Sequence, residues 1–251
     1  MEINYLIINF FSGIFLALFT IGLISNFKIA KFLNLSYGSF FALGAYVAYH
    51  FFLSLHLLSI LILLFISSIF GILLYVLLKK IGNDVLSSTI VSLGLGILIE
   101  EILRLTHVTG YFLILDVPIK VYEIAGVKMA QWELVQFFML ITILTILYAL
   151  YKSKYGIKIK FVEEDVELAT IYGVNINVYQ FSSILLACIL SSVLGFLSST
   201  TQAIFPSMGW GVLVSGIIVL AIASQFRLVG FKQYLVLAIV SIAYAEIIGW
   251  F

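Results

Sequence analysis

Four carboxylates lie close together in the segment EEDVELATIYGVN, residues 163–175, with no cation among them. They are Glu163, Glu164, Asp165 and Glu167. The first three are expected in the first turn of a helix, where the helix dipole favours anions, and Gly173 is expected to end it in a left-handed conformation. A helix of about ten residues is too short to span a bilayer, and this one is too acidic to bind anionic lipid. Its apolar face needs a partner, which is either the chain's own helical bundle or a separate protein.

The chain contains none of the motifs that would indicate catalysis in a membrane protein. It has no H-E-x-x-H, no G-x-S-x-G and no nucleotide-binding G-x-x-x-x-G-K-[ST] sequence. The three histidines, His50, His56 and His107, are expected at the outer ends of helices or in loops, and Cys188 lies in an apolar run that is typical of packing. We therefore expect no catalytic residue, no metal site and no cofactor bound by this chain.

The composition indicates a protein embedded in a lipid bilayer. Apolar residue types make up 63% of the 251 residues and charged types only 10%, which leaves too little polar surface to cover a soluble globule. A net charge of +1 without a concentrated basic face also argues against nucleic-acid binding. Eight apolar stretches approach the length of about 20 residues that a helix needs to cross a bilayer. They cover residues 3–25, 33–50, 57–78, 85–103, 132–150, 178–197, 210–225 and 233–250.

These stretches predict an all-α, polytopic integral membrane bundle with about eight transmembrane helices in one domain, residues 1–251. The second and seventh stretches are short and contain glycine, so either could be a broken or re-entrant helix. Paired interrupted segments of this kind are typical of transporters, where the substrate path runs between two halves of the chain. In the fourth stretch, Arg104 is expected to form an interfacial ion pair with Glu100 and Glu101.

The distribution of lysine and arginine predicts the orientation, because these residues are retained on the cytoplasmic side. With the N-terminus outside, only Arg104, Lys120 and Lys128 lie in outer loops. The cations that then lie inside are Lys28, Lys31, Lys79, Lys80, Lys152, Lys154, Lys158, Lys160, Arg227 and Lys232. This orientation places the acidic segment in a cytoplasmic loop, residues 152–177, and makes residues 105–131 an outer loop. Alternation in IKVYEIAGVKM, residues 119–129, predicts a small hairpin there.

Small residues recur at four-residue intervals in two of the predicted helices. Ser88, Ser92 and Gly96 do so in the fourth, and Ser183, Ala187, Ser191 and Gly195 in the sixth. In lipid, such stripes mark the face on which one helix approaches another closely. Packing alone and the lining of a translocation path are both open interpretations of this pattern. The candidate residues for a seam or path are Asn34, Gly38, Gly44, Ser92, Gly96, Ser191 and Gly195.

Two blocks of sequence resemble a known family. The block KSKYGIKIKFVEEDVELATIYGVN, residues 152–175, has a basic pair, a glycine, further basic residues, an acidic pair, a small residue and a Gly-Val-Asn ending. The block LNLSYGSFFALGAYVAY, residues 33–49, has an Asn-x-x-x-Gly followed by Gly-Ala-Tyr. On these blocks the chain resembles, over essentially its whole length, the permease subunits of ABC importers for branched-chain amino acids. It departs from the family at Tyr37, where histidine is usual, and at Lys28 and Lys31, where small residues are usual.

The resemblance implies a transport subunit rather than an enzyme, located in the cell membrane, with ATP used by a separate ABC ATPase. In such permeases the acidic segment is a coupling helix that docks the ATPase. The residues implied in docking are Lys160, Glu163, Glu164, Asp165, Ala169 and Gly173. The implied partners are ATPase subunits, a second permease subunit that is related or identical, and an extracytoplasmic solute-binding protein. Other small solutes, such as an amide, a urea-like compound or a sugar, remain alternatives, as does an ion-coupled secondary transporter.

Overall fold

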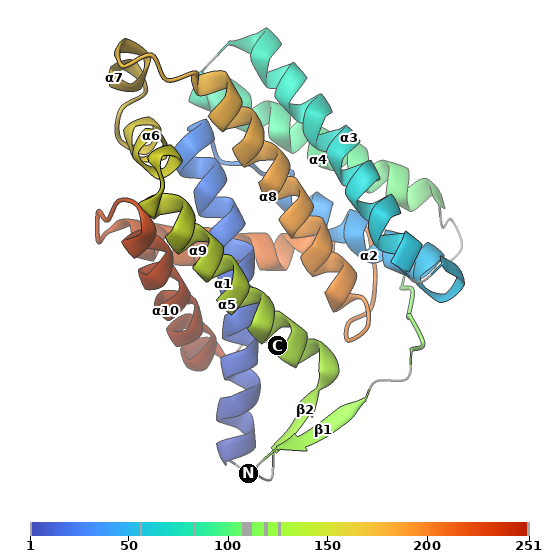
Figure 1. The fold of residues 1–251 in the computed structure, drawn as a ribbon. Helices are drawn as coiled ribbons and strands as arrows, with labels where there is room; N and C mark the ends of the chain where they lie inside the picture. Colours follow the sequence, from blue (N-terminus) through green and yellow to red (C-terminus); the bar gives the residue numbers. More distant parts are fainter. Residues whose placement is uncertain are drawn as a thin grey trace. The chain divides into compact units, whose positions relative to one another are not determined.

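The computed structural model of this chain describes residues 2–55, 57–82, 84–106, 112–117, 120–124 and 127–249. These residues form ten α-helices and one antiparallel hairpin (Figure 1). The elements are α1 Glu2–Ala30, α2 Tyr37–Leu55, α3 Leu57–Ile81, α4 Val85–Thr106, β1 Val121–Ile124, β2 Val127–Ala130, α5 Gln131–Lys152, α6 Lys154–Glu164, α7 Val166–Ile171, α8 Ile176–Ser198, α9 Gly209–Ser224 and α10 Phe231–Ile248. The predicted helical protein is confirmed, and the strands of the hairpin form where alternation predicted them.

Six of the described helices are long and apolar enough to cross a membrane. They are α1 from Leu6, α3, α4, α5, α8 and α10. The protein is therefore a multi-pass membrane protein. Two further apolar helices, α2 with 19 residues and α9 with 16, fall on the two stretches that looked short in the sequence. The count of about eight spans stays a prediction, since it depends on these two helices.

The chain forms two compact units. Unit 1 contains Met1–Ile24, Pro118–Tyr179 and Ser215–Phe251, and unit 2 contains Ser25–Val117 and Gln180–Val214. Each unit is built from segments that are distant in the sequence. Helices that are neighbours in the sequence, such as α2, α3 and α4, pack against one another within a unit.

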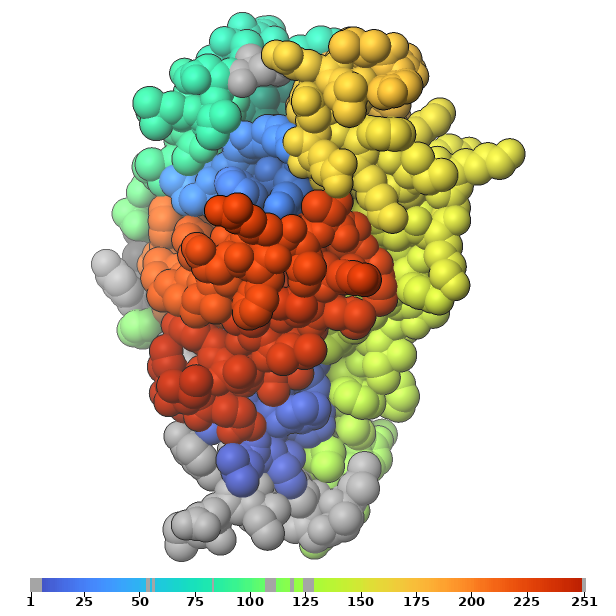
Figure 2. Space-filling view, turned by 90° about the vertical axis from the view of Figure 1, so that its left-hand side faces the viewer, coloured from blue at the N-terminus to red at the C-terminus, as the bar shows by residue number. Residues whose placement is uncertain are grey.

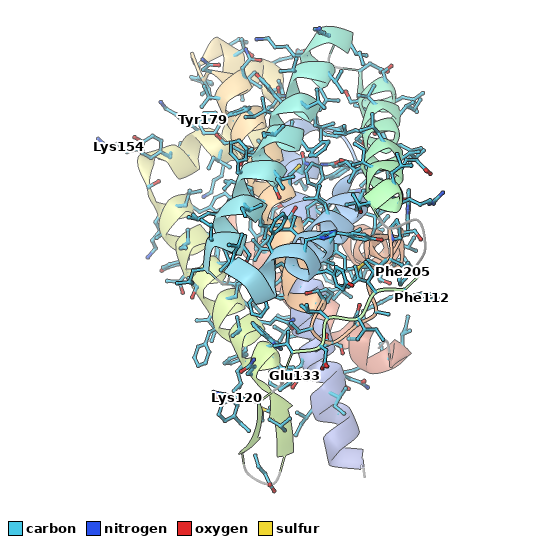
Figure 3. All side chains as sticks on the ribbon, turned by 90° about the vertical axis from the view of Figure 1, so that its right-hand side faces the viewer. Phe112, Lys120, Glu133, Lys154, Tyr179 and Phe205 are labelled. Atoms are coloured by element: carbon cyan, nitrogen blue, oxygen red, sulfur yellow. The ribbon has the colours of Figure 1, made fainter. Side chains whose placement is uncertain are left out.

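In unit 2, α2 lies in the interior and packs against α3 and α4. Its first half, from Tyr37 to Ala48, is buried throughout, as expected for a helix that is apolar on every side. The helix α3 instead alternates buried small residues, among them Ser67 and Gly71, with exposed apolar ones such as Phe65. Outside this bundle, Phe112 and Phe205 meet edge to face beside a short bridge between Leu113 and Ile204 (Figure 3).

In unit 1, the hairpin β1–β2 precedes α5, while α6 and α7 follow it, so these features lie at opposite ends of a 22-residue helix (Figure 1). Lys120 before the hairpin and Lys154 at the start of α6 mark the two ends (Figure 3). The chain turns between α5 and α6 at Ser153, whose Oγ accepts hydrogen bonds from the N–H groups of Tyr155 (3.2 Å) and Gly156 (3.4 Å). This cap ends one helix and begins the next.

Candidate functional site

The acidic segment forms two helices rather than one. The helix α6 ends at Glu164 and α7 begins at Val166, with Asp165 in an extended conformation between them. The Oδ1 atom of Asp165 accepts hydrogen bonds from the N–H groups of Glu167 (2.8 Å) and Leu168 (3.1 Å). Aspartate competes well for this capping position, so the helix restarts there. The prediction of a single helix with Glu163, Glu164 and Asp165 in its first turn is therefore wrong, whereas the left-handed end at Gly173, φ +72°, is confirmed.

The helix α7 lies on the protein surface (Figure 2), and large apolar side chains of this segment are exposed. Leu168 is 39% exposed, Ile171 80% and Tyr172 66%, whereas Ala169 is fully buried. The Tyr172 ring stacks on Phe161 of α6, with ring centroids 5.3 Å apart. The exposed charged residues of the acidic segment are Glu164, Asp165 and Glu167, and Lys160, which precedes the segment, is also exposed. An exposed apolar patch with a polar rim is typical of a surface that binds a partner.

Glu163 differs from its neighbours because its side chain is only 6% exposed. Its Oε1 atom accepts hydrogen bonds from the hydroxyl of Tyr151 and from Nε2 of Gln233 (2.9 Å), and Oε2 accepts one from the N–H of Gly230 (3.3 Å). The hydroxyls of Tyr151 and Tyr234 lie 3.2 Å apart. Glu163 was predicted among the docking residues, but its carboxylate is turned into unit 1 and offers no surface for direct contact.

The sequence analysis missed Tyr151, Gln233 and Tyr234 as functional candidates. A signal for the inward side of α6 did exist, because Gly156, Ile159 and Glu163 follow one another at three- and four-residue spacing and all are buried. Gly156 supports this interpretation, since a Cβ at that position would overlap the backbone of Tyr151. The helix therefore turns this face, including the carboxylate, toward the end of α5.

The candidate seam residues all lie in unit 2 around α2. A Cβ on Gly44 would overlap the carbonyl of Ser192, and a Cβ on Gly195 would overlap the carbonyl of Phe41. Ser191 Oγ donates a hydrogen bond to the carbonyl of Tyr37 (2.6 Å). The helices α2 and α8 thus touch backbone to backbone, which only small residues permit.

The start of α2 lies against the middle of α4. The Oγ of Ser92 accepts a hydrogen bond from the N–H of Leu35 (3.0 Å), and a Cβ on Gly96 would come within 3.1 Å of Ser36 Cα. Asn34 Oδ1 caps this turn by accepting hydrogen bonds from the N–H (3.1 Å) and the hydroxyl (2.6 Å) of Ser36. The short helix α2 therefore begins part-way along a membrane-spanning helix.

The first residues of α9 lie beside the first residues of α2. A Cβ on Gly38 would come within 2.9 Å of the carbonyl oxygen of Gly209, and one on Gly209 would overlap the carbonyl of Gly38. The two short helices thus begin next to each other, as interrupted helices do around transporter substrate sites. The seam residues lie at helix contacts, and their part in a translocation path stays a prediction.

Glu100 is a buried carboxylate at the same junction. It is 8% exposed, and its Oε1 atom accepts hydrogen bonds from Ser39 Oγ (2.8 Å) and Trp210 Nε1 (2.7 Å). Arg104 pairs instead with Glu101 at 3.0 Å, on the exposed side of α4. The ion pair was predicted for both glutamates and forms with one. Glu100 continues the four-residue spacing of Ser92 and Gly96, so the stripe itself could have placed it inside.

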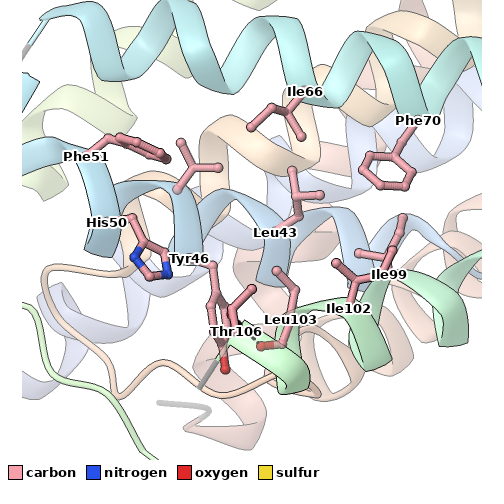
Figure 4. Close-up of a pocket in the computed structure, with 11 residues that line it drawn as sticks. Leu43, Tyr46, His50, Phe51, Ile66, Phe70, Ile99, Ile102, Leu103 and Thr106 are labelled. Carbon is pink, nitrogen blue, oxygen red and sulfur yellow. Dashed lines mark hydrogen bonds between the residues drawn. The ribbon is translucent and has the colours of Figure 1, made fainter. Parts of the chain in front are cut away.

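An apolar cavity of about 180 Å³ lies between α2, α3 and α4 in unit 2. Figure 4 shows side chains such as Leu43, Ile66 and Phe70 pointing into it, with His50 and Thr106 toward one end. Its walls offer no charged group. Among the residues that the structure describes, no cluster of three His, Cys, Asp or Glu side chains could hold a metal ion.

Comparison with known proteins places the chain in a family. A family model described as the permease component of the branched-chain amino acid transport system matches residues 5–249. No curated protein and no solved structure matches the chain. The matched range contains both the α6–α7 segment and the junction around α2, so the resemblance seen in the two sequence blocks is confirmed. The chain belongs to the family of branched-chain amino acid transport permease components.

Proposed function

We propose that this chain is the membrane-spanning permease subunit of an ATP-driven importer that takes up branched-chain amino acids. Separate ATPase subunits dock on α7, a second permease subunit completes the membrane part, and an extracytoplasmic binding protein delivers the solute. Family membership supports the transport class, and the branched-chain amino acid transport systems to which the family belongs support the solute class. The observation that carries the proposal is the exposed surface of α7.

The α7 surface has the features that an ATPase contact requires. Leu168, Ile171 and Tyr172 supply exposed apolar area, and Glu164, Asp165 and Glu167 surround it with negative charge. Large apolar side chains at the centre and charges at the rim are the common arrangement of protein interfaces. A basic or mixed-charge groove on the ATPase would complement this rim.

The position of α7 relative to the hairpin supports a transmembrane orientation. These two features lie at opposite ends of α5, which is long and apolar enough to span a bilayer. The lysines that cluster at the α6 end of α5 favour the cytoplasm for that end. The hairpin end is then extracytoplasmic, within reach of a solute-binding protein.

The junction where α2 and α9 begin supports the choice of an amino acid with an apolar side chain. Its walls combine glycine and serine with apolar residues, and the one carboxylate there, Glu100, is already bonded to Ser39 and Trp210, so a path there would accept a small aliphatic side chain. The seam residues Gly38, Ser92 and Ser191 would line or border that path. Uptake measured with loaded binding proteins for aliphatic amino acids, amides and sugars would identify the solute, and a preference for sugars would contradict this choice.

Docking on α7 is tested with the chain reconstituted in vesicles and the ATPase subunit of its transport system. Ile171→Asp should weaken ATPase binding about a hundredfold, because truncation or charging of a central interface residue removes much of the binding energy. Tyr122→Asp, an exposed aromatic on the hairpin, is the control and should leave ATPase binding unchanged.

The same vesicles test the orientation and the energy source. The ATPase should bind inside-out vesicles and not right-side-out ones. Binding to right-side-out vesicles would overturn the orientation. If the chain alone moved solute with no ATPase present, it would be a secondary transporter and the proposal would be wrong.

A further inference from the structure

Glu163 joins three segments of unit 1 through one buried carboxylate. Its partners are Tyr151 near the end of α5, Gly230 immediately before α10, and Gln233 in the first turn of α10. Hydrogen bonds to an ionised acceptor are shorter and stronger than bonds between neutral groups. Because these bonds lie in a buried site, water does not compete for them.

The carboxylate also lies next to α7 in the chain. Asp165, which caps α7, is two residues away, and α7 itself buries only Ala169 among its six residues. Because so little of α7 is buried, its own packing against unit 1 contributes little to holding it in place. The end of α6, where Glu163 is bonded, is therefore one route by which a force on α7 reaches the rest of the unit.

The contacts of α10 reinforce this connection. Gly230 has a positive φ of +71°, and a Cβ at that position would come within 2.8 Å of Lys160 Cε, so the α6 side chain lies directly over the turn. The Tyr151 and Tyr234 rings, from α5 and α10, lie side by side with centroids 5.7 Å apart. The ends of α5, α6 and α10 thus meet around Glu163.

We propose that Glu163 is a positioning residue that transmits ATPase-driven movement of α7 to α5 and α10, and so sets how much solute moves for each ATP hydrolysed. This inference rests on the proposed docking of the ATPase at α7. Glu163 itself contacts neither the ATPase nor the solute. Its effect is therefore expected in the ratio of transport to hydrolysis rather than in ATPase affinity.

The experiment uses the full transporter, with ATPase and loaded binding protein, in vesicles. Glu163→Ala should bind the ATPase with unchanged affinity and hydrolyse ATP, yet move at least about tenfold less solute per ATP, because it loses three hydrogen bonds to the carboxylate and one such bond alone corresponds to about that factor. Glu163→Gln keeps an acceptor for Tyr151 and Gln233 but not for Gly230. The amount of solute that it moves per ATP should therefore lie between the values of the unmodified protein and Glu163→Ala. Glu101→Ala, an exposed glutamate of α4, is the matched control and should keep the ratio of the unmodified protein.

A second variant keeps the proposal testable if Glu163→Ala does not fold. Tyr151→Phe retains the ring and removes only the hydroxyl that donates to Glu163, and it should lower the ratio severalfold. In a double-mutant cycle, the combined variant should move as much solute per ATP as Glu163→Ala alone, because both changes break the same connection. Additive effects, or an unchanged ratio in folded Tyr151→Phe, would overturn the proposal.

The outcomes separate this inference from the proposed function. If the unmodified chain fails to bind the ATPase, the docking proposal fails. If the ATPase binds, Ile171→Asp abolishes that binding, and Glu163→Ala still transports at the full ratio, then docking stands and only the role of Glu163 is wrong.

Discussion

The junction around α2 in unit 2 and the corner around Glu163 in unit 1 are both buried, but they are held together differently. At the junction, Gly44 and Gly195 bring the backbones of α2 and α8 into direct contact. At the corner, a carboxylate holds three segments through side-chain and backbone donors. The space between the helices restricts which residues fit at the junction, whereas the pairing of buried polar groups restricts which residues fit at the corner.

This difference has a mechanical consequence. These contacts lie between a glycine and the backbone of the facing helix and involve no rotatable side chain, so the helices can separate only as rigid bodies. At the corner, three segments are joined through hydrogen bonds to one carboxylate, so a single substitution can loosen the connection between them. The junction is therefore sensitive to added volume and the corner to the loss of one polar group.

The largest loss of stability is expected at the contact between α2 and α8, where there is no space for a side chain. Gly195→Ala places a methyl group on the Phe41 carbonyl, and the helices must separate to accommodate it. Overpacking typically costs about 1–3 kcal/mol, and a methyl group that overlaps a backbone carbonyl, which cannot rotate away, is expected to exceed that range. Thermal unfolding in detergent should show a large drop or a loss of folded protein.

The matched control is Gly94→Ala on α4, where a Cβ would meet no atom within 4 Å. Alanine favours a helix over glycine by about 1 kcal/mol, so this variant should be as stable as the unmodified chain or more stable. Equal losses at both positions would show that close backbone approach does not hold the junction.

A smaller loss of stability is expected at Glu100, whose buried carboxylate accepts two hydrogen bonds in unit 2. Glu100→Ala leaves the buried Ser39 hydroxyl and Trp210 Nε1 without their acceptor. Unpaired buried donors cost about 1–3 kcal/mol, and the unfolding temperature should fall accordingly. Glu101→Ala removes only an exposed ion pair, which contributes about 0–1 kcal/mol. If Glu101→Ala lost more stability than Glu100→Ala, the hydrogen bonds of the buried carboxylate would not be what stabilises this part of unit 2.

The smallest effect is expected at the exposed edge of unit 2. Asp84 accepts hydrogen bonds from the N–H (3.0 Å) and the hydroxyl (2.7 Å) of Ser87 at the start of α4, and these bonds lower the pKa of Asp84 below its ordinary value of 3.8. Because the folded-state pKa is the lower one, the stabilisation is complete above pH 3.8 and disappears as the pH falls through the folded-state pKa.

Asp84→Ala should therefore lower the unfolding temperature slightly at neutral pH and leave it unchanged in acid. Unfolding curves of both proteins across the two conditions provide the measurement. A difference that persisted below the folded-state pKa would mean that the cap acts through something other than the charge of Asp84.

The sequence by itself determined the features that depend on local pattern. Apolar runs located the helices, alternation located the hairpin strands, and the spacing of Ser92, Gly96, Ser191 and Gly195 located the faces that meet α2. These inferences succeed because burial repeats with the period of the helix or strand. The motif blocks around α2 and α6 then indicated the family.

Only the tertiary structure decided which distant groups the buried carboxylates contact. Glu100 and Glu101 are adjacent, yet one bonds to Trp210, which is 110 residues away, and the other to a surface arginine. Glu163 and Glu164 differ in the same way. Glu163 is buried and bonds to Gln233, which lies 70 residues further along the chain, whereas Glu164 is exposed. A carboxylate is buried where distant donors satisfy it, and the local spacing of residues carries no record of those donors.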